Sequence, residues 1–161
     1  MGNIRVFSLV VFMILFSGIE IQAQQYNTAI GVRAGFGTGF TVRHAMNSAV
    51  TLEGIALFQH KGFEFTGLYE LQNPNAFDVD RLNWYYGFGG HIGFFDSSHP
   101  RRDDNEEGQF MTLGIDGILG IEYNFSEVPI NLSVDWKPNI DLIGGTGFGG
   151  DSGALSVRYY F

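Results

Sequence analysis

Cysteine is absent from this chain of 161 residues, so neither a disulfide framework nor a thiolate metal site can form. Charged residues are also scarce, at 16%, and the formal net charge is −8. Because a nucleic-acid-binding surface normally needs a basic face, this balance argues against nucleic acid as a partner. It also gives no reason to expect attraction to anionic lipid headgroups.

Long apolar runs are missing as well, except near the start of the chain. Arg5 precedes an apolar run from Val6 to Phe16, and small and polar residues then lead to Ala23. This order predicts a cleaved secretory signal peptide over residues 1–23, with cleavage after Ala23. A membrane-anchoring helix is the alternative, but the run of about 11 residues is shorter than the roughly 20 that a spanning helix needs. Residues 24–161 are then predicted to form one domain.

Glycine and phenylalanine are frequent instead, with 23 and 16 residues. They occur where apolar and polar residues alternate, which is the pattern of a β-strand with two different faces. From Pro129 to Lys137, for example, every second residue is large and apolar. Turn-forming segments divide the chain into eight predicted strands: 27–36, 38–45, 49–59, 62–72, 82–95, 109–125, 129–142 and 153–161. The sequence therefore predicts an all-β fold.

The two faces of these strands differ in charge. The polar face carries the following residues: Arg33, Arg43, Glu53, Glu64, Glu70, His91, Asp116, Glu122, Asp135, Lys137 and Arg158. A soluble barrel turns its apolar face inward, whereas an outer-membrane barrel turns it outward. Aromatic residues near the ends of the apolar faces, glycine on the polar face and the predicted export favour the outer-membrane barrel. A soluble, calycin-like ligand-binding barrel is the alternative fold.

The chain closes on the residues RYYF, Arg158 to Phe161. With the export signal and eight amphipathic strands, residues 24–161 resemble the small outer-membrane barrels of the OmpA/OmpX type in Gram-negative bacteria. The resemblance implies an eight-stranded antiparallel transmembrane β-barrel, apolar outside, with a charged plug inside, because eight strands leave space only for side chains. It also implies that Tyr159 and Phe161 belong to the signal that the barrel-assembly machinery reads. The resemblance further implies that the protein is a monomer and that outer-membrane lipid and lipopolysaccharide surround it.

Histidine and acidic residues invite other interpretations. His91, between glycines on the polar face, is expected to be a hydrogen-bonded interior residue. His99 follows Ser97 and Ser98 and precedes Asp103, a combination that suggests a hydrolase or acyltransferase. Some eight-stranded barrels do modify lipid A, but nothing in this loop positions a catalytic base.

A partial calcium-binding pattern lies in the same loop. Asp103, Asn105 and Glu107 match the first half of a calcium loop, but Gly114 stands where the closing acid belongs. Weak binding of calcium, or of cations that bridge lipopolysaccharide, is the alternative to a solvated loop. If the N-terminal end of the barrel faces the periplasm, this long charged connection, residues 96–108, faces outward.

We therefore expect an integral outer-membrane barrel with a structural or surface-interaction role and a lumen closed by charged side chains. We expect no catalytic residue, cofactor or metal, and the surface partner stays unidentified. Three alternatives remain open: a narrow, porin-like channel for small solutes or ions, a lipid A-modifying acyltransferase or deacylase, and the calycin-like carrier.

Overall fold

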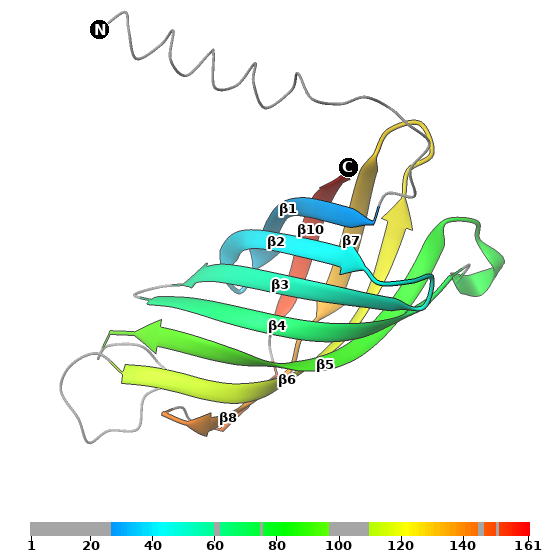
Figure 1. The fold of residues 1–161 in the computed structure, drawn as a ribbon. Coiled ribbons are helices and arrows are strands. Elements are labelled where there is room, and N and C mark those ends of the chain that lie inside the picture. Colours follow the sequence, from blue (N-terminus) through cyan, green and yellow to red (C-terminus); the bar gives the residue numbers. More distant parts are fainter. Residues whose placement is uncertain (1–26, 60–61, 75, 97–109, 145–146, 151) are drawn as a thin grey trace, which may run out of the picture.

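The structure is a computed structural model that describes residues 27–59, 62–74, 76–96, 110–144, 147–150 and 152–161. The predicted signal peptide and residues 97–108 of the long loop lie outside this part of the chain. The strands are β1 (Thr28–Gly35), β2 (Thr38–Ala45), β3 (Val50–Gln59), β4 (Gly62–Asn73), β5 (Leu82–Phe95), β6 (Phe110–Asn124), β7 (Ile130–Trp136), β8 (Asn139–Ile143), β9 (Phe148–Gly149) and β10 (Gly153–Tyr160) (Figure 1). A 3-10 helix, η1 (Ala76–Asp78), lies in the connection between β4 and β5. Within the described ranges, no helix has the length and apolar character needed to cross a membrane.

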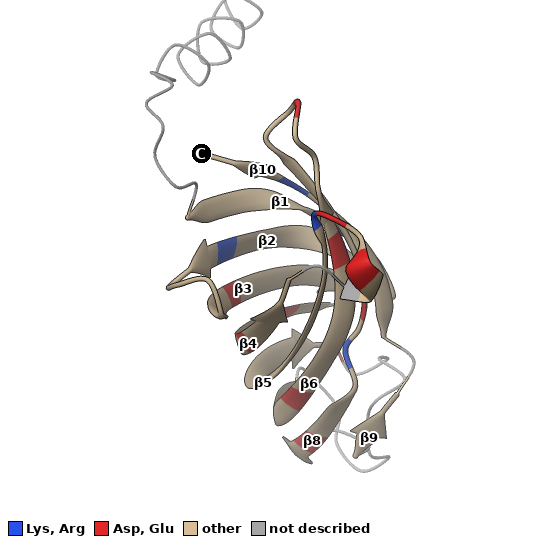
Figure 2. Cartoon of the chain, turned by 90° about the vertical axis from the view of Figure 1, so that its right-hand side faces the viewer, with Lys and Arg blue, Asp and Glu red and all other residues tan. Residues whose placement is uncertain are grey.

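These strands close into an eight-stranded antiparallel barrel, which confirms the predicted fold class. Consecutive strands from β1 to β6 are hydrogen-bonded neighbours, β7 pairs with β6 and β10, and β10 pairs with β1. Val32 of β1 lies opposite Val157 of β10, where the first and last strands meet. Figure 2 shows β10 and β1 to β6 following one another along a curved wall. We call the end of the barrel that holds Thr28 and Tyr160 the terminal end, and the opposite end the loop end.

The predicted strand over residues 129–142 is interrupted at Lys137 and Pro138, which separate β7 from β8. Proline has no backbone N–H and cannot donate to a neighbouring strand. The register against β6 nevertheless continues, because Leu119 lies opposite Trp136 and Asp116 lies opposite Asn139. The Pro138 carbonyl also accepts a 2.8 Å hydrogen bond from the Gly117 N–H. Together β7 and β8 thus form one side of the wall, and β9, which was not predicted as a strand, pairs with β8.

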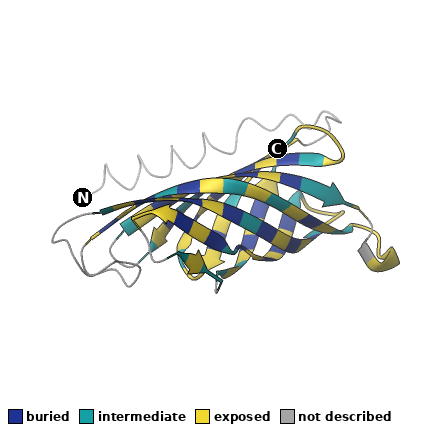
Figure 3. Ribbon diagram, turned by 90° about the horizontal axis from the view of Figure 1, so that it is seen from below, coloured by how far each residue is buried: buried dark blue, intermediate teal, exposed yellow. Residues whose placement is uncertain are grey.

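Buried and exposed residues alternate along most of the strands, as Figure 3 shows. The buried residues are mainly polar, and many of the exposed ones are large and apolar. In β6, for example, Ile121 is 43% exposed, whereas its neighbour Glu122 is 4% exposed. Because successive side chains of a strand point to opposite faces, this alternation separates an apolar exterior from a mainly polar interior.

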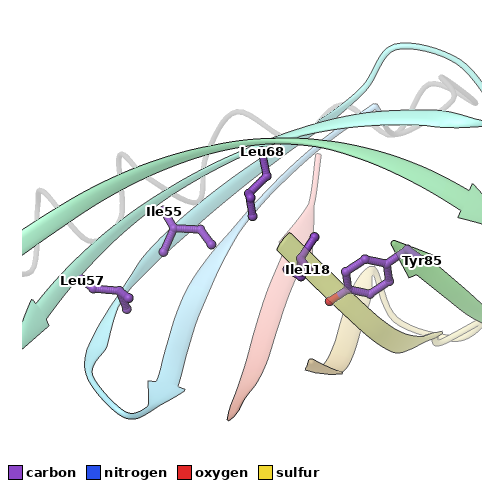
Figure 4. Packing of buried hydrophobic residues seen from close by; sticks show 5 residues of the cluster. All are labelled: Ile55, Leu57, Leu68, Tyr85 and Ile118. Atoms are coloured by element: carbon purple, nitrogen blue, oxygen red, sulfur yellow. The ribbon is translucent and has the colours of Figure 1, made fainter. Parts of the chain in front are cut away.

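The buried hydrophobic cluster is small. It comprises Ile55, Leu57, Leu68, Tyr85 and Ile118, contributed by β3, β4, β5 and β6 (Figure 4). These side chains share the interior with buried arginine, lysine and carboxylate groups. The interior therefore depends on paired charges as well as on apolar contacts, because a buried charge is tolerated only when it is paired.

Candidate functional site

The structure places all of the charged residues assigned to the polar face in buried positions. They are Arg33, Arg43, Glu53, Glu64, Glu70, His91, Asp116, Glu122, Asp135, Lys137 and Arg158. Alternation brings each of these side chains to the same side of its strand, and closure of the sheet brings the strands to face one another. The candidate site is this interior network, which has four parts.

Arg43 of β2 is the centre of the part nearest the terminal end. Its guanidinium donates hydrogen bonds to Glu122 of β6 and to Glu70 of β4, and all three residues are at least 96% buried. The Arg43 Nε also lies 3.8 Å from Glu53 Oε2, and its Cζ lies 4.7 Å from the centroid of the Tyr85 ring. A single cation therefore links acids from opposite sides of the barrel, and the arginine fork suits such multiple contacts.

Arg158 of β10 makes the next set of contacts. Its Nη2 donates to Glu53 Oε1 at 2.5 Å, and its Nη1 donates to Ser133 Oγ at 2.6 Å and to Asn131 Oδ1 at 3.1 Å. Because Glu53 also lies near Arg43, this carboxylate connects the two arginines. The hydroxyl and amide acceptors satisfy guanidinium donors that the carboxylate does not reach.

Arg33 of β1 and Asp135 of β7 form a bidentate pair. Nη1 donates to Oδ2 at 2.6 Å and Nη2 donates to Oδ1 at 2.5 Å, and the Asp135 side chain has no exposed surface. The Tyr85 hydroxyl donates to the same Oδ2 at 3.3 Å. Parallel contacts of this kind are among the strongest in proteins and also fix the relative orientation of the two groups.

Lys137 and His91 organise the part nearest the loop end. Lys137 Nζ donates to Asp116 Oδ1 at 2.7 Å and to Glu64 Oε1 at 3.2 Å. His91 Nδ1 lies 2.8 Å from Asp116 Oδ2, and its Nε2 lies 2.9 Å from Asp141 Oδ1. Glu64 and Asp116 therefore share the ammonium group of Lys137. Among the described residues, no group of His, Cys, Asp or Glu is arranged to hold a metal ion.

Asp141 is the charged interior residue that sequence reasoning missed. It is 8% exposed and lies in β8, beyond Pro138. The signal was present, because Asp141 continues the alternation of Asp135 and Lys137 at even spacing. Extending that period through the proline would have placed Asp141 on the polar face.

The two ends of the barrel differ in the space that they enclose. A cavity of about 900 Å³ opens at the terminal end, and Arg43, Glu122, Asn83 and Tyr160 are among its lining residues. A cavity at the loop end measures only about 20 Å³ and is lined by residues that include Arg33, Glu64 and Lys137. The interior charge network lies between these two spaces.

Other sequence candidates fall elsewhere. His99, Ser97, Ser98, Asp103, Asn105 and Glu107 lie outside the described residues. Tyr159, at the end of β10, is 39% exposed, and Phe161 is 53% exposed. The Phe161 N–H donates a 3.0 Å hydrogen bond to the Thr28 carbonyl, so the end of the chain stays attached to the first strand.

No protein-family model matches the chain, and no curated protein matches its sequence. A solved structure does resemble it: the N-terminal β-barrel domain of Pseudomonas aeruginosa OprF, with a TM-score of 0.63 and 14% sequence identity. The match covers 86% of this chain and 100% of the OprF domain chain. The fold is an OmpA-type barrel. The expected resemblance is thus confirmed for the fold.

Proposed function

We propose that this protein is an integral outer-membrane barrel with a structural or surface-interaction role, and that its charged network closes the lumen. The observation that carries the proposal is the set of buried ion pairs that cross the interior from different strands, such as Arg43 with Glu70 and Glu122. An eight-stranded barrel is just wide enough for side chains to fill it. Arg43 borders the cavity at the terminal end, whereas Arg33 and Lys137 border the small cavity at the loop end.

The exterior supports insertion into lipid. Outward side chains along the strands include Phe40, Phe65, Ile115 and Val134, and each is more than half exposed. A soluble barrel with this surface would present a large contiguous apolar area to water, which soluble monomers rarely do. The alternative of a soluble calycin-like carrier is therefore disfavoured.

Aromatic pairs occur toward both ends of the outer surface. Trp84 stacks on Tyr86 near the terminal end of β5, with ring centroids 5.4 Å apart. Phe63 and Phe94 lie 5.2 Å apart near the loop end. Bands of aromatic residues at both membrane interfaces are typical of transmembrane barrels. In the orientation that this arrangement supports, the barrel crosses the bilayer, and the two aromatic pairs lie at its two opposite surfaces.

Export and assembly complete the proposal. The predicted signal peptide, cleaved after Ala23, would direct the chain across the inner membrane. Tyr159 and Phe161 would then serve as part of the signal for the barrel-assembly machinery, and lipid and lipopolysaccharide would surround the inserted monomer. The long connection between β5 and β6 would face the cell exterior and offer a surface for contacts.

Membrane fractionation with cysteine labelling tests the location directly. Since the natural chain has no cysteine, Asp103→Cys and Ser126→Cys each introduce a single thiol. We expect both variants in the outer-membrane fraction of a Gram-negative host. On intact cells, a membrane-impermeant maleimide should label Asp103→Cys alone, and cell disruption should also expose Ser126→Cys, which lies in the turn between β6 and β7. A detergent-free soluble protein, or the reverse labelling pattern, would contradict the proposal.

A further inference from the structure

His91 lies between two carboxylates, one at each ring nitrogen. The Nδ1–Asp116 Oδ2 distance is 2.8 Å and the Nε2–Asp141 Oδ1 distance is 2.9 Å. The side chains of His91 and Asp116 have no exposed surface, and that of Asp141 is 2% exposed. Water is therefore not available to separate the ring from either acid.

The hydrogen-bond donors and acceptors of the imidazole and the two carboxyl groups determine how many protons this arrangement needs. A neutral imidazole has one N–H donor and one acceptor nitrogen, and an ionised carboxylate has acceptors only. With His91 neutral and both acids ionised, one ring nitrogen would direct its lone pair at a carboxylate oxygen across less than 3 Å. One additional proton removes this conflict, whether it makes His91 an imidazolium or makes one acid a carboxylic acid.

The surrounding charges favour the same additional proton. Glu64 of β4 and Lys137, between β7 and β8, are the other charged groups of this part of the interior, and Lys137 contacts both Glu64 and Asp116. Without the proton, the single cation of Lys137 would face three carboxylates. With the proton on His91, two positive charges face three negative ones, and with it on an acid, one positive charge faces two. In either case less negative charge is left unpaired, and a buried charge is much less costly when it is paired.

The backbone leaves room for the ring. Gly114 of β6 lies opposite His91 in β5, and a Cβ atom at Gly114 would lie 2.5 Å from His91 Cε1. The imidazole thus packs against the backbone of Gly114. It lies between the side chains of Asp116, which is also in β6, and Asp141, which is in β8. Asp141 itself lies opposite Gly114, next to the register shift between Leu113 and Gly114.

We propose that His91, Asp116 and Asp141 form a buried proton-binding site, and that its bound proton holds β8 against β5 and β6. The site connects three separate strands, and β8 with β9 forms the edge of the sheet at the loop end. Loss of the proton leaves one ring nitrogen of His91 with its lone pair directed at Asp116 or at Asp141, so that one of these two contacts becomes repulsive. The link that His91 makes between β6 and β8 then weakens, and β8 becomes less firmly attached as the pH rises.

Nitrogen NMR of the histidine rings tests the proposal on the mature chain refolded in detergent micelles. At neutral pH we expect the His91 ring to give the signals of a doubly protonated imidazolium. His44 serves as an internal reference, because its Nδ1 contacts the Thr28 hydroxyl at 2.8 Å, and a hydroxyl can donate or accept.

Asp141→Asn is the matched variant. An amide can donate to a neutral ring nitrogen, so this change removes the need for the additional proton while keeping the shape of the side chain. We expect its His91 ring to be singly protonated at the pH where the natural ring is doubly protonated. As the pH rises, the exchange rates of the β8 backbone amides should increase more in the natural chain than in Asp141→Asn.

Carboxyl carbon NMR completes the experiment. A neutral ring accompanied by a protonated Asp116 or Asp141 would also support the bound proton, at a different atom. A neutral ring with both carboxylates ionised at neutral pH would overturn the proposal. Equal exchange of β8 in the natural chain and in Asp141→Asn, at every pH, would overturn the attachment of β8 by that proton.

Discussion

Arg158 and Glu53 meet inside the barrel, with Nη2 and Oε1 2.5 Å apart, although 105 residues separate them in the chain. Glu53 comes from β3 and Arg158 from β10, and β1 and β2 lie between these strands in the wall. The contact therefore spans the curvature of the barrel rather than a strand pair. It also places a carboxylate between two arginines, since Arg43 Nε lies 3.8 Å from the same group.

Neutralising Glu53 should strongly destabilise the barrel. Glu53→Gln leaves Arg158 without its carboxylate and removes one acid from Arg43, and breaking a buried pair in this way costs on the order of 3–5 kcal/mol. The free energy of unfolding by guanidinium in lipid vesicles measures the effect. The matched control is Glu127→Gln, an exposed turn residue, which should change stability by less than about 0.5 kcal/mol. Similar losses in both variants would contradict a structural role for the Glu53 pair.

The assignment of the two faces makes a second prediction. Ile121 faces outward at 43% exposure, and an arginine near the middle of a bilayer costs roughly 2–4 kcal/mol. Ile121→Arg should therefore reduce folding into vesicles, as followed by the shift of the folded band in electrophoresis without heating. Glu127→Arg introduces the same side chain in an exposed turn and should fold normally. Normal folding of Ile121→Arg would mean that this face does not meet lipid.

Two glycines with opposite surroundings give a third prediction. A Cβ atom at Gly120 would lie 2.4 Å from Tyr85 Cζ, whereas one at Gly67 would meet nothing within 4 Å. Gly120→Ala should displace Tyr85 from Asp135 and Arg43, and we expect a loss of about 1–3 kcal/mol from this overpacking. Gly67→Ala should be neutral or stabilising by up to about 1 kcal/mol, because glycine weakens a strand. The free energies of unfolding of the two variants in lipid vesicles provide the comparison. A larger loss of stability for Gly67→Ala than for Gly120→Ala would contradict the packing described for the interior.

Processing of the chain gives a fourth prediction. We expect a mature N-terminus at Gln24, because Ala23 follows the apolar run at the position of a cleavage site. N-terminal sequencing of protein isolated from the membrane fraction provides the measurement. Ala23→Leu should slow processing, since the cleavage site favours small residues. Retention of Met1 in the membrane-bound natural protein would remove the proposed route of export.

Much of the wall was predictable from the sequence because alternation is a local property. The predicted strand 82–95 agrees with β5, and the residues assigned to the polar face are those that the structure buries. The ion pairs were not predictable, because they depend on the stagger between strands, which no local pattern records. Glu70 and Glu122 both meet Arg43, for example, although they come from β4 and β6. Asp141 lay within the predicted strand 129–142 but beyond Pro138, and because the alternation was not followed through the proline, its buried position and its contact with His91 were missed.

The most direct test of the closed interior is the ionic current through the refolded natural protein in a planar lipid bilayer. We predict no steady conductance at neutral pH, because in the proposed closed barrel the buried pairs of Arg43, Arg158, Arg33 and Lys137 leave no open path between the two ends. Glu122→Gln and Asp116→Asn should lower stability without producing a steady current. A steady current through the natural protein, with an ion selectivity that changes in these two variants, would contradict a closed lumen and identify the network as the lining of a channel.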